Sequence, residues 1–354
     1  MRRGAVITAA ATYIGTVVGA GFASGQEVLQ FFGLLGPWGF PAAAIAIAGF
    51  AVFGYLIMDA GREARATSHL AVLRRTTGRL TPVFDLIVTF FLFGALSAMI
   101  AGAGSVLRQE YNVPWAIGAG LLCLATVVTV LFGLKGVVTS ISTVVPFLLG
   151  SVLVVSLAVL SMRGLAIRTP PAAAVPAVPF WPLAGVTYIS YNVVMSVPVL
   201  ASLGGSLRSR KEAGWGAYLG ATGLGLSLLL VYFSLVSSFP DVASYEVPMA
   251  YLASTVHALG GPFYTVVFLA EVYTTAVANL YGFSARLTRE GSRAFRLTTI
   301  LTGLAGTVAA SAGFSTLVRI VYPVVGWAGL ALLIALLLDY FRRRSTSRRT
   351  RSGR

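Results

Sequence analysis

The amino-acid sequence predicts an all-α integral membrane protein with ten transmembrane helices in two sets of five. Composition gives the membrane class, because 57% of the 354 residues are hydrophobic and only 10% are charged, against roughly one quarter charged in soluble domains. The mean hydropathy is +0.85. The two sets of five follow from a pattern of helices that recurs at half the chain length.

Charge-free segments supply the individual helices, since a bilayer is crossed by about 20 apolar residues. The Met-Arg-Arg start followed by an apolar run resembles a signal peptide, but the run continues through residue 33, so we interpret it as the first span. No soluble domain of any size remains. The predicted spans lie near 4–33, 37–59, 82–107, 114–132, 137–161, 179–204, 214–238, 261–285, 296–312 and 314–341.

The net charge of +15 follows the predicted topology. With ten spans, twenty-two Lys and Arg residues fall on one side of the membrane and three on the other. This positive-inside asymmetry places both termini in the cytoplasm of a cell-membrane protein. Nucleic-acid binding has no stacking motif to support it. The basic tail, 342–354, is expected to be a disordered, solvated anchor, with contact to anionic lipid headgroups as the alternative.

Internal repetition divides the chain into two halves. A shift of 177 residues carries the pair Trp38-Gly39 onto Trp215-Gly216, and it places the third to fifth spans on the eighth to tenth. Because five is odd, the second set crosses the membrane in the opposite sense, which is an inverted-topology repeat. The expected divisions are a first repeat over 1–177, a second over 178–341 and the tail over 342–354.

The first span of each half contains residues that are unusual inside a membrane helix. Residues 15–27 read GTVVGAGFASGQE, and residues 186–200 read VTYISYNVVMSVPVL. Unpaired backbone groups are tolerated in hydrocarbon where they line a cavity, and paired interruptions in inverted halves point to a transporter's binding site. We therefore expect helices one and six to be broken. Close helix packing through two GxxxG patterns is the alternative for the first.

The stretch GTVVGAGFASGQEVLQFF, residues 15–32, resembles the signature of the YkvI-type family of bacterial membrane proteins. That family is similar to the amino acid, polyamine and organocation transporter superfamily, and the resemblance covers essentially the whole chain. It implies a LeuT-like fold, the five-plus-five inverted repeat of sodium-coupled amino acid transporters, with substrate held between unwound first and sixth helices. It implies no particular substrate.

In that fold the substrate cavity lies at the two broken helices. Ala20 and Gly21 would offer backbone amides near a half-helix end, which suits an anionic group such as a substrate carboxylate. The segment 241–259 is expected to form a re-entrant or interfacial helix that caps the cavity. Contacts between packed helices are the alternative for the polar side chains of span six. Those expected to face the cavity are Tyr188, Tyr191, Asn192 and Ser196.

A cation-binding site is a second implication of the resemblance. Glu271, Thr274 and Thr275 share one face of the eighth span through their i, i+3, i+4 spacing. In related sodium-coupled transporters that face supplies one carbonyl and two hydroxyls, and the first half-helix supplies two more carbonyls, matched here by Gly15 and Val18. Threonines bonded back to their own helix are the alternative.

Glu271 departs from that pattern, because only its carbonyl would be used. A carboxylate at that depth suits a proton or a substrate amine instead. The expected coupling ion is therefore Na⁺ or, alternatively, H⁺, and no other cofactor or metal is expected.

Two ionisable residues lie within spans near the expected outer entrance, Glu27 in the first span and Arg319 in the tenth. Intramembrane charge is a functional hypothesis by default. We predict that Glu27 and Arg319 form a gating ion pair that closes above the substrate. The alternatives are two independent residues facing an aqueous vestibule, and a proton-carrying role for Glu27.

The remaining reactive residues predict no catalytic or metal site. Cys123 is expected to be a packed thiol, and His69 and His257 lie far apart without ligand-spaced partners. Asp59 and Asp339 lie at helix ends and Asp85 lies just inside one, where solvation or pairing with arginine is expected. The sequence holds no nucleophile–base constellation and no phosphate loop, which argues against an enzyme.

The sequence therefore predicts a secondary active transporter, a cation-coupled symporter of a small amino acid or related amine that works by alternating access. A ligand-sensing membrane receptor with the same fold and no net transport is the alternative, although the chain offers only a short basic tail as an output. A channel is disfavoured because the sequence has no pore loop or ring of carboxylates. Substrate identity, direction of transport and oligomeric state are left open.

Overall fold

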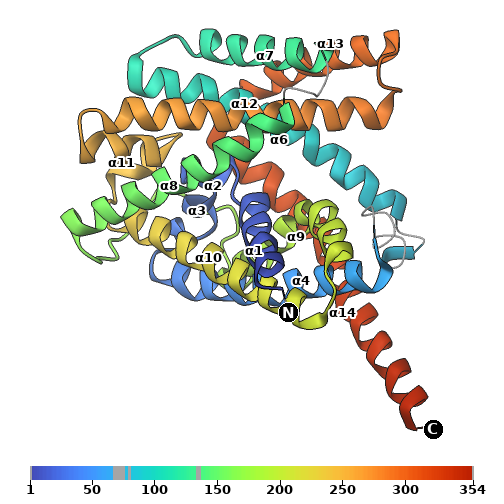
Figure 1. The fold of residues 1–354 in the computed structure, drawn as a ribbon. Coiled ribbons are helices and arrows are strands. Elements are labelled where there is room, and N and C mark those ends of the chain that lie inside the picture. Colours follow the sequence, from blue (N-terminus) through green and yellow to red (C-terminus); the bar gives the residue numbers. More distant parts are fainter. Residues whose placement is uncertain (1, 67–75, 79–80, 133–136, 353–354) are drawn as a thin grey trace.

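A computed structural model describes residues 2–66, 76–78, 81–132 and 137–352, and the regular structure in these ranges is helical (Figure 1). Eight helices there are long and apolar enough to cross a membrane; α1–α3 and α13 fall outside this set. The elements are α1 (Arg3–Val17), α2 (Ala20–Ser24), α3 (Gln26–Phe31), η1 (Gly33–Trp38), α4 (Gly39–Ala64), α6 (Thr81–Tyr111), α7 (Trp115–Phe132), α8 (Val137–Arg163), α9 (Trp181–Ser206), α10 (Arg210–Val236), η4 (Asp241–Ser244), α11 (Pro248–Val256), α12 (Gly260–Leu287), α13 (Arg293–Ala310) and α14 (Phe314–Ser352).

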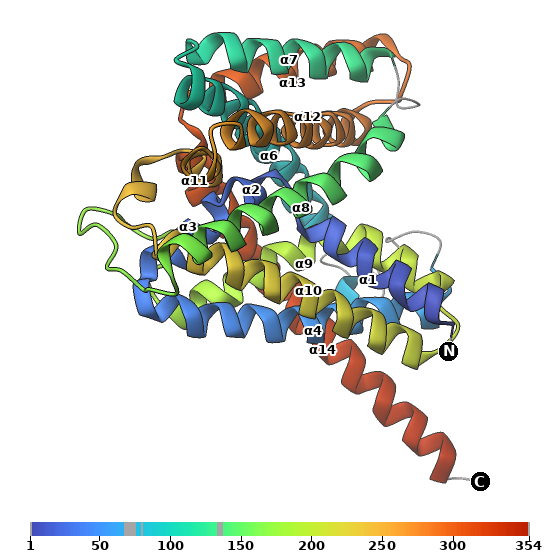
Figure 2. The same ribbon diagram turned by 60° about the vertical axis from the view of Figure 1, so that its left-hand side comes forward.

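The long helices form two groups that lie apart in both views (Figures 1 and 2). In the first group, α4 packs on α9 and α10, and α1 packs on α10 and α9. In the second group, α6 packs on α12, α7 and α13, which also contact one another. Helices α14 and α8 connect the groups, because α14 contacts α9 and α6 while α8 contacts α10 and α12. The short α2 and α3 lie between the two groups.

The first predicted span is interrupted, as expected. Helix α1 ends at Val17, residues 18 and 19 have extended backbone, and α2 runs for only five residues before Gly25 adopts a left-handed φ of +80°. The turn is held by Ser24, whose hydroxyl donates to the Gly21 carbonyl at 2.6 Å and accepts from the Gln26 amide at 2.9 Å. Only glycine enters the left-handed region without steric cost, which explains Gly25.

The sixth predicted span is continuous, which corrects the expectation of a second broken helix. Helix α9 runs through all the polar residues and through Pro198. The Asn192 side chain donates to the Tyr188 carbonyl at 2.9 Å, and the Ser196 hydroxyl donates to the Asn192 carbonyl at 2.6 Å. Because these groups satisfy their hydrogen bonds on the preceding turn, they remain inside an intact helix.

Three smaller expectations have clear outcomes. Segment 241–259 forms η4 and the nine-residue α11, which packs on α2 but does not line the central cavity described below. The tail is not separate from the last span, since α14 continues as a helix to Ser352. Cys123 is a buried free thiol, 3.4 Å from the Gly303 carbonyl. His69 lies outside the described residues.

Glycines allow the α4–α9 contact in the first group to be very close. A Cβ added to Gly204 would lie 2.3 Å from the Met58 carbonyl oxygen, and one added to Gly61 would lie 2.1 Å from the Ala201 carbonyl oxygen. Backbone therefore touches backbone at this interface. Small residues that permit such approach are the usual means of packing helices in membranes.

We expect Gly204→Ala to destabilise the protein by about 1–3 kcal/mol, because the new methyl group has to push α4 and α9 apart. Gly120→Ala in α7 is the matched control, since a Cβ there has nothing within 4 Å. The measurement is the thermal unfolding midpoint of purified protein in detergent. Equal midpoints for the two variants would contradict the close α4–α9 contact.

Candidate functional site

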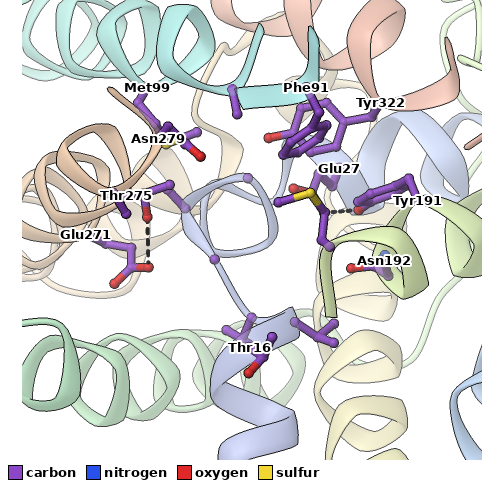
Figure 3. A pocket seen from close by; sticks show the side chains of 18 of the residues that line it. Thr16, Glu27, Phe91, Met99, Tyr191, Asn192, Glu271, Thr275, Asn279 and Tyr322 are labelled. Carbon is purple, nitrogen blue, oxygen red and sulfur yellow. Dashed lines mark hydrogen bonds between the residues drawn. The ribbon is translucent and has the colours of Figure 1, made fainter. Parts of the chain in front are cut away.

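A cavity of about 200 Å³ surrounds the α1–α2 interruption, between the two helix groups (Figure 3). Its walls come from α1, α2, α3, α6, α9, α12 and α14. Ten residues singled out by the sequence line it: Gly15, Val18, Ala20, Gly21, Glu27, Tyr191, Asn192, Glu271, Thr274 and Thr275. The structure thus brings together residues from the start, middle and last third of the chain.

Unpaired backbone groups form the centre of the wall. The Val18 amide makes the last bond of α1, to the Ile14 carbonyl at 2.8 Å. By helix geometry, the final carbonyls of α1 and the first amides of α2 have no partner within their own helices. Residues 15–21 all line the cavity. This stretch of backbone therefore offers carbonyl oxygens and amide hydrogens to whatever occupies the cavity.

Glu27 lies on one side of the interruption and is 5% exposed. Its Oε2 accepts a hydrogen bond from the Tyr191 hydroxyl of α9. A Cβ added to Gly21 would lie 1.9 Å from Glu27 Oε1, so the carboxyl group packs directly on the Gly21 α-carbon. Figure 3 shows Glu27 and Tyr191 together on this side of the α1–α2 link.

Glu271 lies on the other side of the link, on α12, and is 3% exposed (Figure 3). Its Oε1 is 3.4 Å from the Thr275 hydroxyl, and its buried Oε2 has no hydrogen-bond partner in the described part of the chain. The Thr274 hydroxyl donates back to the Glu271 carbonyl at 3.0 Å, which is the helix-bonded alternative for this threonine. Two turns further along, the buried Asn279 Nδ2 likewise has no hydrogen-bond partner among the residues that the structure describes.

Three aromatic rings form a wall beside Glu27 that the sequence did not single out as a unit. The ring centroids of Tyr191 and Tyr322 are 5.1 Å apart, and those of Phe91 and Tyr322 are 5.6 Å apart. Phe91 and Tyr322 carry no sequence signal that separates them from other aromatic residues in spans. Asn279 was detectable, because it continues the face of Glu271 and Thr275 at intervals of four residues.

Three predicted site residues do not line the cavity. Tyr188 packs in an aromatic cluster, with its ring centroid 4.8 Å from that of Phe32, and Ser196 is bonded within α9. Arg319 is exposed, while Glu27 is buried against Tyr191, so the predicted gating ion pair is not formed in this structure. The reason is that Val318 and Tyr322 take the buried face of α14.

The cavity is acidic. Its lining contains Glu27 and Glu271 and, among the described residues, no Lys, Arg or His.

The structure pairs two aspartates at helix ends with arginine, as the sequence suggested: Asp59 with Arg62 at 2.7 Å, and Asp85 with Arg286. Within the described ranges no group of three or more His, Cys, Asp or Glu side chains could hold a metal ion.

No protein-family profile matches the chain. Two curated proteins from Bacillus subtilis (strain 168) are similar to the chain in sequence. The uncharacterized protein YyaD is 29% identical over 344 residues, covering 92% of this chain and 94% of YyaD. The uncharacterized membrane protein YkvI is 29% identical over 351 residues, covering 97% of this chain and 98% of YkvI.

Solved structures share the fold of the chain. The inward-facing conformation of Mhp1 matches with a TM-score of 0.62 at 17% identity, over 96% of this chain and 77% of Mhp1. MhsT in complex with L-phenylalanine matches with a TM-score of 0.61 at 17% identity, over 93% of this chain and 87% of MhsT. The chain is therefore a multi-pass membrane protein with the LeuT fold and a homologue of YkvI and YyaD.

Proposed function

We propose that the protein is a secondary active transporter that carries a small amino acid or related amine together with a cation, by alternating access of one helix group against the other. The observation that carries this proposal is the position of the cavity. It lies at an interrupted helix, between two separately packed groups, in a fold shared with known transporters. Binding sites of secondary transporters are typically built at such interruptions.

The ten-span inverted repeat is part of the proposal, and the helix bounds support it. Shifted by 177 residues, α6 would cover 258–288, where α12 runs over 260–287. The same shift carries α7 onto 292–309, where α13 occupies 293–310. In this arrangement α1 to α3 count as one interrupted span and α13 as another. The charge bias then places both termini in the cytoplasm.

The proposed coupling site lies on the Glu271 side of the cavity. Gly15 and Val18 would contribute carbonyl oxygens, Thr274 and Thr275 hydroxyls, and Glu271 its carbonyl. Their shared presence in the cavity wall supports this set. The free carbonyls at the end of α1 are also the negative end of its helix dipole, which favours a cation. Na⁺ is the proposed ion, with H⁺ carried on Glu271 or Glu27 as the alternative.

We expect sodium-stimulated uptake to be lost in the Thr274→Ala, Thr275→Ala double variant, because two of the five proposed oxygen ligands are removed. Thr222→Ala is the control, since this threonine bonds back to its own helix on an exposed surface. The measurement is uptake into proteoliposomes under sodium or proton gradients. Equal uptake in sodium and choline media by the unmodified protein would contradict sodium coupling and favour a proton.

We expect Gly19→Leu to abolish ligand binding and uptake while leaving the unfolding midpoint within a few degrees of the parent. A Cβ on Gly19 has no atom of the described residues within 4 Å, and Gly19 lines the cavity, so a larger side chain would begin in open space and extend into the binding space. Gly120→Leu, in open space on α7, controls for the added apolar bulk. Normal uptake by Gly19→Leu would show that the substrate binds elsewhere. In the unmodified protein, robust ligand binding without flux would favour the alternative function, a sensor.

A further inference from the structure

We propose that Glu27 selects the charge of the substrate: its carboxylate binds the ammonium group of an organic cation and excludes substrates that carry a carboxylate. This inference rests on the proposed function, and it narrows the substrate from "small amino acid or related amine" to the amine. The ligand has one positive group beside Glu27 and an apolar body. The zwitterion of an ordinary amino acid is a poor fit.

The steric observation is the position of the Glu27 carboxyl group. A substrate carboxylate would have to approach the amides of Ala20 and Gly21, at the first turn of α2. Glu27 Oε1 already occupies the space over Gly21, 1.9 Å from where a Cβ would stand. A second carboxylate in that place would meet like charge at close range, which is strongly unfavourable away from bulk water. Glu27 therefore stands where an amino acid substrate would put its own carboxylate.

The charge balance of the cavity points the same way. Two nearly buried carboxylates, Glu27 and Glu271, face a lining with no cationic side chain among the described residues. Buried charges need an opposite charge close by. The coupling cation proposed beside Glu271 supplies one such charge. The Tyr191 hydroxyl donates only a neutral hydrogen bond to Glu27, so the second positive charge is left for the substrate to bring.

The surroundings of Glu27 suit an organic cation better than a bare metal ion. The Tyr191 hydroxyl bonds to Oε2 of Glu27. Tyr191, Tyr322 and Phe91 surround the same end of the cavity. Aromatic faces attract ammonium groups through their quadrupoles and offer contact area to an apolar body. Met99 and Met195 extend that apolar lining.

The test is binding to purified full-length protein at saturating NaCl, measured by calorimetry and thermal shift. Four probes share one body and differ in charge: phenethylamine, phenylalanine, 3-phenylpropionate and phenethyl alcohol. A second set uses isoamylamine, leucine and 4-methylpentanoate. We expect each amine to bind at least about tenfold more tightly than its amino acid, because only the amine pairs with Glu27 without bringing a like charge. The carboxylates should not bind.

Glu27→Gln keeps an acceptor for Tyr191 and removes the charge. We expect it to weaken amine binding by about tenfold or more and to abolish the preference over the amino acid, with the fold checked by the unfolding midpoint. Glu290→Gln is the control, because that carboxylate is exposed, accepts a hydrogen bond from Tyr281 and does not line the cavity.

Three results would overturn the assignment: amino acids binding as tightly as the amines, no amine of either set binding, or an unchanged preference in Glu27→Gln. Uptake of the same probes into proteoliposomes is measured separately from binding, so that a failure of the Glu27 assignment can be distinguished from a failure of the transport proposal. Uptake of phenylalanine or leucine without amine binding would refute the role of Glu27 and leave transport standing. Amine binding that depends on Glu27, with no flux under either gradient, would support the selectivity and refute transport.

Discussion

The rest of the structure depends on one constraint, that backbone polar groups exposed by a broken helix must be given partners away from water. At the α1–α2 interruption, the carbonyls of residues 15–18 and the amides of residues 19–22 lose their intrahelical bonds. Such backbone is tolerated at membrane depth where it is enclosed by protein or lines a cavity. The two helix groups provide the enclosure, and the cavity lies between them at the interrupted backbone.

The interruption of the first span could be predicted because glycine often marks a backbone position with a positive φ or a close contact at its α-carbon. Gly25 has to be glycine for its positive φ, and Gly21 because the Glu27 carboxyl lies on its α-carbon. Polar side chains do not indicate a particular backbone conformation, and this is why the predicted break in the sixth span is wrong. Asn192 and Ser196 bond within their own helix, so the same residue types that accompany a break in α1 are compatible with an unbroken α9.

Long-range partners were the least predictable part of the site. Spacing alone placed Glu271 and Thr275 on one face, because a single helix fixes that relation. To predict a pair between Glu27 and Arg319, one has to know how α3 and α14 are each oriented about their own axes, and no local sequence pattern gives this. The structure instead places Tyr191 at Glu27 and leaves Arg319 exposed. Tyr322, which lies beside both Tyr191 and Phe91, could not be distinguished from other apolar positions in α14.

Helix α2 lies in the chain between α1 and α3, which pack on the first helix group, but α2 itself contacts α12 of the second group. The Tyr264 hydroxyl of α12 donates to the Ala23 carbonyl, and α2 also contacts α11 and α8, whereas α1 before it and α3 after it pack on α9 and α10. Its two ends are the extended Val18-Gly19 link and the left-handed Gly25. The segment is therefore a short helix with a non-helical backbone position on each side. In the transport cycle proposed above, a ligand bound at residues 18–21 would act on the same torsion angles that set the position of α2 relative to α1.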